Sequence, residues 1–191
     1  MNEIKNYINT FLFKMRAKNY LNTSEREHRF VSYDKAKTVL ILFDSDYNEK
    51  NPELRKIIQS LQQDGKKVSA WGFIDKKEIS TAILPDFRIL HHQQTDFFHK
   101  PLPSYINELE DLNFDLLLDL SLEMVIPLQY LAMYANASFK VGMRKTELPI
   151  YDFLLDLESQ KSLSEPTDDP IDEIYLYNQM IFYLKSIQTI D

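Results

Sequence analysis

Asp44 and Asp46 are the residues whose types and spacing come nearest to a catalytic pattern. They follow a short apolar run, residues 38–43, that is rich in β-formers. Carboxylates can act as nucleophiles and as ligands of Mg²⁺. The alternative is a polar loop whose carboxylates accept hydrogen bonds from backbone N–H groups, ahead of a helix that begins at Pro52.

Other polar residues also stand directly after apolar β-segments. Where such segments run parallel, their carboxyl ends meet at one edge of the sheet, and ligands bind there at the point where strand order reverses. The predicted crevice residues are Asp44, Asp46, Ser121, Glu123 and Arg144. Arg144 would make an anion contact. For Arg144 and Lys145 together, a solvated surface pair is the favoured interpretation.

Three further polar residues are weighed as ligands or catalysts. Asp119 interrupts the apolar run 114–120, so its carboxylate must be hydrogen-bonded or have a raised pKa. A satisfied structural role is favoured over a catalytic one. His91 and His92 are adjacent, and neighbouring strand residues point to opposite faces. The sequence therefore predicts no metal site.

Composition excludes several classes of protein. The three glycines, Gly65, Gly72 and Gly142, form neither a P-loop nor a GxGxxG fingerprint, and GxSxG and HExxH are absent. With a net charge of −7, nucleic-acid binding is not expected. Without cysteine there is no disulfide or thiolate chemistry, and a cytoplasmic location is expected. The apolar runs fall short of the roughly 20 residues that span a bilayer.

Apolar β-segments alternate with helical spacing along the rest of the chain. Strands are predicted at 38–43, 68–73, 87–90, 114–120 and 138–141, and helices at 52–63, 105–112 and 124–135. This order predicts an α/β, Rossmann-like three-layer sandwich with a mainly parallel sheet. Only nine residues separate Val141 from a further strand at 151–157. Because a parallel crossover needs about a dozen residues, that strand is expected to be an antiparallel edge.

The two ends of the chain are predicted to be helical and oppositely charged. Residues 1–22 form an amphipathic N-terminal helix with four basic residues against one acid, and 37–191 form a single domain. Residues 151–191 carry nine acids against two lysines and contain a helix that begins at Asp169-Pro170. The N-terminal helix is expected to pack on the domain itself or on a second copy, and the expected partner is a second copy in a homodimer through the terminal helices. Contact of the N-terminal helix with an anionic membrane surface is the alternative.

Three resemblances accompany these patterns. Asp44 and Asp46 resemble the aspartate pair of haloacid-dehalogenase-type phosphatases, although Tyr47-Asn48 stand where that family has Gly-Thr. The run 114–120, with 135–142 after it, resembles the N-terminal half of heptosyltransferase-type glycosyltransferases, whose nucleotide-sugar-binding second half has no counterpart here. The basic amphipathic N-terminal helix, the run 114–120 and Tyr151-Asp152-Phe153-Leu154 resemble those of small Bacteroidetes proteins with a domain of unknown function, and this resemblance covers the whole chain.

The sequence thus favours a non-enzymatic or degenerate Rossmann-like binding domain. The alternative is a small enzyme, either a Mg²⁺-dependent phosphoryl hydrolase or a relative of the glycosyltransferases, that uses Asp44, Asp46 and Ser121. No cofactor is assigned.

Overall fold

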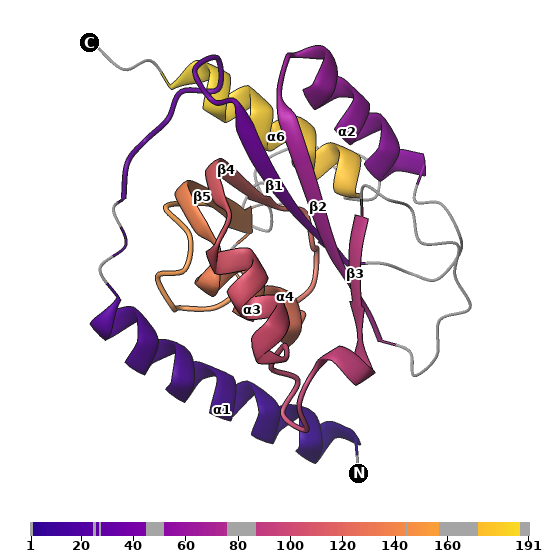
Figure 1. Cartoon of the computed structure of the whole chain (residues 1–191), viewed down its shortest axis with the longest axis vertical. Coiled ribbons are helices and arrows are strands. Elements are labelled where there is room, and N and C mark those ends of the chain that lie inside the picture. Colours follow the sequence, from indigo (N-terminus) through magenta and orange to yellow (C-terminus); the bar gives the residue numbers. More distant parts are fainter. Residues whose placement is uncertain are drawn as a thin grey trace, which may run out of the picture.

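A computed structural model of the chain describes residues 2–24, 26, 28–44, 52–75, 87–143, 145–156 and 172–187. Its centre is a six-stranded sheet in the order β3-β2-β1-β4-β5-β6, in which every neighbouring pair is parallel (Figure 1). The strands are β1 (Thr38–Asp44), β2 (Lys67–Ile74), β3 (Phe87–His91), β4 (Asn113–Asp119), β5 (Asn136–Met143) and β6 (Phe153–Leu155). This arrangement confirms the α/β, Rossmann-like fold.

The helices form the outer layers. They are α1 (Asn2–Thr23), α2 (Pro52–Gln63), α3 (Pro103–Glu110), α4 (Ile126–Tyr134) and α6 (Glu173–Ser186), with a short 3₁₀ turn, η1 (His92–Gln94). α2 and α6 cover one face of the sheet, and α3 and α4 cover the other (Figure 1). α1 lies across α4, where Phe13 meets the Tyr130 ring edge-on at 4.9 Å. Among the described residues, no helix combines the length and apolarity needed to cross a membrane.

β1 is apolar from Val39 to Phe43 because both of its faces are covered. Val39 and Ile41 point into the core beneath α2 and α6, whereas Leu40 and Leu42 point into the core beneath α3 and α4. A strand buried on both faces has no polar positions to alternate with apolar ones. The continuous apolar run therefore identified this strand correctly.

The predicted antiparallel edge strand is wrong. β6 pairs parallel to β5, with Phe153 opposite Val141 and Leu155 opposite Met143. The parallel pairing needs no crossover helix, because β6 pairs only with the last three residues of β5 and the connection therefore has to run back over a short distance. The connection supplies core side chains of its own, since Ile150 and Tyr151 are buried against the α4 side of the sheet.

The C-terminal helix begins later than predicted. Asp172, in extended conformation, accepts a hydrogen bond from the backbone N–H of Tyr175 at 2.7 Å and is the N-cap of α6. Asp169 and Pro170, the predicted start, lie outside the described residues. Asp172 suits the N-terminal end of α6 because its side-chain oxygen accepts a hydrogen bond from one of the N–H groups of the first turn, which have no partner within the helix.

Candidate functional site

The carboxyl ends of β1 and β4 lie side by side, at the point where strand order reverses. Leu42 pairs with Asp119, and the backbone N–H of Leu120 donates to the Leu42 carbonyl at 2.8 Å. Asp44 ends β1 two residues beyond Leu42, and Ser121 follows β4 two residues beyond Asp119. The two backbones therefore reach the same edge of the sheet.

The five predicted crevice residues differ in burial, and two of them fall outside the described residues. Asp44 is half-buried, Ser121 is buried and Glu123 is exposed. Asp46 and Arg144 lie outside the described residues. Asp44 and Ser121 remain candidates by position, but their roles in binding or catalysis stay a prediction.

Asp119 lies at the centre of a buried polar network at this edge. Its side chain is fully enclosed. Oδ1 accepts hydrogen bonds from the backbone N–H of Ser121 at 3.0 Å and from the Ser121 hydroxyl. Oδ2 accepts from Lys145 Nζ at 2.9 Å, from Gln129 Nε2 at 3.2 Å and from the Tyr151 hydroxyl. Both oxygens of Asp119 are thus hydrogen-bonded, as a carboxylate inside an apolar strand requires, and its structural role stays a prediction.

Lys145 is not the solvated surface residue predicted from its position after a strand. Its side chain is only 4% exposed and pairs with Asp119, and Nζ also donates to the Ser121 hydroxyl at 2.6 Å. A carboxylate at the buried end of β4 needs a nearby cation, because an unpaired buried charge is costly. β4 and β5 are neighbours, so the segment after β5 can supply that cation.

The network fixes the charge state of its members. Burial by itself would raise the pKa of Asp119, but the Lys145 ammonium and the hydrogen bonds from Ser121 and Tyr151 outweigh it and hold that pKa below its usual value. Burial, together with the neighbouring Asp119 carboxylate, raises the pKa of the Tyr151 hydroxyl well above 10. At neutral pH the network therefore holds a carboxylate and a neutral phenol.

Gly142 makes room for the Tyr151 ring. A Cβ at this position in β5 would lie 2.7 Å from the ring, closer than side-chain atoms can approach. The glycine therefore allows the Tyr151 ring to lie against β5 while its hydroxyl reaches Asp119.

Ser121, Lys145 and Asp119 are residue types that can form a nucleophilic serine with a lysine base. In this structure, however, Ser121 is completely buried, and its hydroxyl is shared between Asp119 and Lys145. The network joins the turn after β4 to α4 through Gln129 and to the segment after β5 through Lys145 and Tyr151. Its arrangement suits holding this edge of the sheet together. Within the ranges that the structure describes, no three His, Cys, Asp or Glu side chains are grouped to hold a metal ion.

Sequence reasoning missed Gln129, Lys145 and Tyr151 as partners of Asp119. A signal existed for the lysine, because a carboxylate inside an apolar strand requires a cation. No comparable signal marked the other two residues. Gln129 lies on a helix that is apolar on most sides, and Tyr151 falls within the strand predicted at 151–157.

The comparisons with known proteins give a family and no activity. No curated protein and no solved structure matches the chain. A family model, described as a family of unknown function and named DUF6913, matches residues 9–167, which include most of α1, all six strands and the whole Asp119 network. The chain belongs to the DUF6913 family.

Proposed function

We propose that this domain works by binding rather than by catalysis, and that it associates with a second copy of itself through the outer face of α1. The observation that carries the proposal is the apolar character of that face. Tyr7, Ile8, Phe11 and Met15 are exposed there, while Phe13 and Ala17 on the opposite side of the helix are completely buried. α1 is thus apolar on both sides, although only one side is covered by the chain's own core.

The spacing of the exposed residues suits a second helix. Ile8, Phe11 and Met15 recur at intervals of three and four residues, so they form one stripe along the helix. Such stripes on two antiparallel copies can pack against each other, and a twofold contact uses the same surface on both partners. Figure 1 shows α1 along the rim of the molecule, where a second copy would have access.

The apolar stripe itself favours a second copy over a membrane. Lys14 and Lys18 flank the stripe and would attract anionic lipid, but the whole chain carries −7, which an anionic surface repels. A second copy carries the same net charge, so charge does not separate the two partners, but a second copy also brings an equivalent apolar stripe. Against a catalytic role, the Ser121 hydroxyl and the Lys145 ammonium are already bound to Asp119 and to each other.

Sedimentation velocity of the full chain tests the association. We expect a dimer that Phe11→Glu and Met15→Glu each convert to a monomer, because a carboxylate would have to be buried in the contact. Phe182→Glu on α6 is the matched control, since Phe182 is 63% exposed and Phe11 59%. A wild-type monomer would refute the proposal, as would a dimer that only Phe182→Glu dissociates.

Liposome sedimentation distinguishes a membrane from a second copy as the partner of the exposed stripe on α1. Vesicles containing anionic lipid are mixed with the full chain and with a version lacking residues 1–22. Equal pelleting of both excludes a membrane role for α1. Selective pelleting of the full chain, without self-association in solution, would favour the membrane over a second copy.

The enzymatic alternative is tested by thermal shift. A Mg²⁺-dependent phosphoryl hydrolase or a glycosyltransferase relative should gain melting temperature with Mg²⁺ together with nucleotides or nucleotide sugars. Asp44→Asn and Asp46→Asn should abolish that gain. A gain with this sensitivity would replace binding with catalysis as the function of the crevice.

A further inference from the structure

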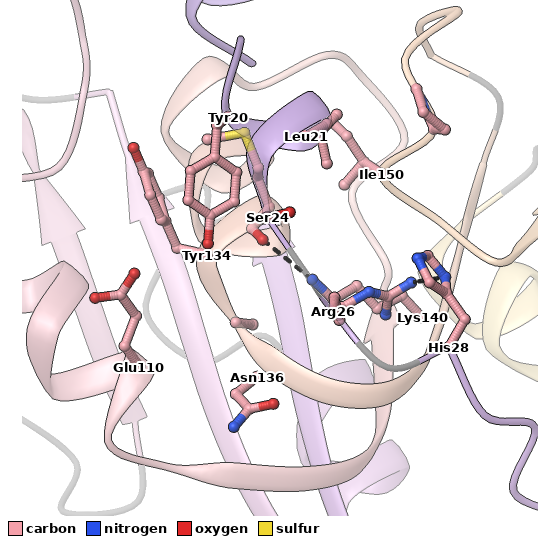
Figure 2. Close-up of a pocket in the computed structure, with 13 residues that line it drawn as sticks. Tyr20, Leu21, Ser24, Arg26, His28, Glu110, Tyr134, Asn136, Lys140 and Ile150 are labelled. Atoms are coloured by element: carbon pink, nitrogen blue, oxygen red, sulfur yellow. Dashed lines mark hydrogen bonds between the residues drawn. The ribbon is translucent and has the colours of Figure 1, made fainter. Parts of the chain in front are cut away.

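A pocket of about 360 Å³ opens at the other end of the sheet from the Asp119 network (Figure 2). Its walls come from the end of α1, the segment after it, the ends of α3 and α4, and β5. The residues that give it chemical character are Tyr20, Arg26, Glu110, Tyr134, Asn136 and Lys140. The volume lies near the lower limit of about 300 Å³ for pockets that hold small molecules.

Lys140 provides a buried amino group, which can take up a proton, in the wall of this pocket. Its side chain is 1% exposed, and Nζ donates to the carbonyls of Ala132 at 2.7 Å and Met133 at 3.1 Å, at the end of α4. An ammonium group has three N–H donors, so one remains beyond these two bonds. Burial, reinforced by the nearby Arg26 charge and opposed by Asp152, lowers the pKa of Lys140 to about 7.

Beside Lys140 lie two further basic side chains, Arg26 and His28, and one carboxylate, Asp152. Arg26 Nη2 binds Asp152, and Arg26 Nη1 donates to the Ala137 carbonyl at 3.0 Å. His28 Nδ1 lies 2.5 Å from the same Asp152 carboxylate. One carboxylate therefore serves an arginine, a histidine and, more distantly, Lys140.

The opposite side of the pocket is acidic and aromatic. Figure 2 shows Glu110 across the pocket from Lys140, with the rings of Tyr20 and Tyr134 above it. The two rings meet edge-on, with their centroids 4.6 Å apart. Burial, and then the charge of Glu110, raises the pKa of Tyr20, which places that carboxylate near the ring.

We propose that this pocket binds a small zwitterion of the amino-acid class, with its carboxylate at Lys140, its ammonium group toward Glu110 and an aromatic side chain against Tyr20 and Tyr134. The polarity of the pocket matches the polarity of such a ligand. Binding a carboxylate beside Lys140 favours the charged ammonium, so the ligand brings a proton with it and its affinity falls as pH rises above neutrality.

Isothermal titration calorimetry of the full chain tests whether the ligand needs both charges. The ligands are phenylalanine and two analogues that each lack one of its charged groups. We expect phenylalanine to bind, and phenethylamine and 3-phenylpropionate, which each lack one charge, to bind at least about tenfold more weakly. Binding of phenylalanine should weaken by up to about tenfold per pH unit above 7. Equal binding of 3-phenylpropionate and phenylalanine would contradict the proposal that the ligand is a zwitterion. No binding by any of the three would overturn the proposal.

Two variants locate the ligand in this pocket. Lys140→Met should weaken phenylalanine and 3-phenylpropionate alike, whereas Glu110→Gln should weaken phenylalanine and leave 3-phenylpropionate unchanged. Glu110 is exposed, so its variant tests the proposal even where Lys140→Met disturbs folding. Glu108→Gln, on the same helix but paired with Arg88 outside the pocket, is the matched control and should bind as the wild type does. Binding that Glu110→Gln leaves intact would contradict the proposed orientation.

Discussion

Asp119 and Lys145 form a buried ion pair whose two halves depend on each other. Asp119→Ala leaves the Lys145 ammonium buried without its carboxylate, so we expect it to cost about 3–5 kcal/mol in the free energy of unfolding. Ser121→Ala removes one hydrogen bond and should cost about 1–2 kcal/mol. Urea unfolding monitored by circular dichroism measures both. A double variant, Asp119→Leu with Lys145→Met, should be more stable than Asp119→Ala, and failure of this recovery would argue against the pair.

The lowered pKa of Asp119 also predicts how stability responds to acid. A carboxylate whose pKa is lower in the folded than in the unfolded state stabilises the fold above the unfolded value. That contribution disappears as pH falls through the folded pKa. We therefore expect the difference between wild type and Asp119→Asn to shrink in acid, which urea midpoints across the acidic range would show.

Lys140 gives the opposite dependence on pH. Its pKa is about 7 in the folded protein, against about 10.4 in an unfolded chain, so between these values the unfolded chain binds more protons. Stability should therefore rise with pH above 7, by up to about 1.4 kcal/mol per unit. Lys140→Met should lack this rise when unfolding midpoints are compared at several pH values. Parallel curves for the two proteins would contradict a neutral, buried amine.

Gly72 and Gly65 are required for different reasons, the first by lack of space and the second by its backbone conformation, and substitutions distinguish the two. In β2, a Cβ on Gly72 would lie 2.5 Å from the Phe43 ring, so Gly72→Ala should cost about 1–3 kcal/mol by crowding the core. Gly65 has open space around it but a φ of 77°. Gly65→Ala should therefore cost about 1–2 kcal/mol through backbone strain. Thermal unfolding should show that Gly65→Asn recovers most of that cost, because asparagine tolerates this conformation, whereas Gly72→Asn recovers nothing.

The elements themselves were mostly predictable, because their signals are local. The apolar run of β1 and the spacing of Leu54, Ile57 and Leu61 in α2 identified both elements within a residue or so of their ends. The direction of β6 was not predictable from loop length alone. It depended on how little of β5 the returning chain had to retrace and on Tyr151 packing over Gly142.

The candidate site was less predictable than the fold, because its contacts join distant residues. Sequence spacing brought Asp44 and Ser121 to one edge of the sheet. It could not show that Lys145 turns inward to Asp119, 26 residues away. The pocket at Lys140 escaped notice for the same reason, since Arg26 and Glu110 reach it from separate segments.

At the scale of the whole molecule, each half of the sheet is one continuous stretch of chain. β1, β2 and β3 form one half, β4, β5 and β6 form the other, and the two meet where β1 lies beside β4. Pairs across this junction, such as Val39 with Leu116, join residues 77 positions apart, whereas Val39 and Val68 are 29 apart.

Closing the longer loop costs more entropy, so we expect each half to assemble early and the junction to close last. In a refolding experiment with pulsed hydrogen exchange, the amide of Leu120, which donates across the junction to Leu42, should be protected later than the amides between β1 and β2. Simultaneous protection would contradict this order. The same architecture implies that a chain severed between β3 and α3 should still reconstitute the fold from its two fragments.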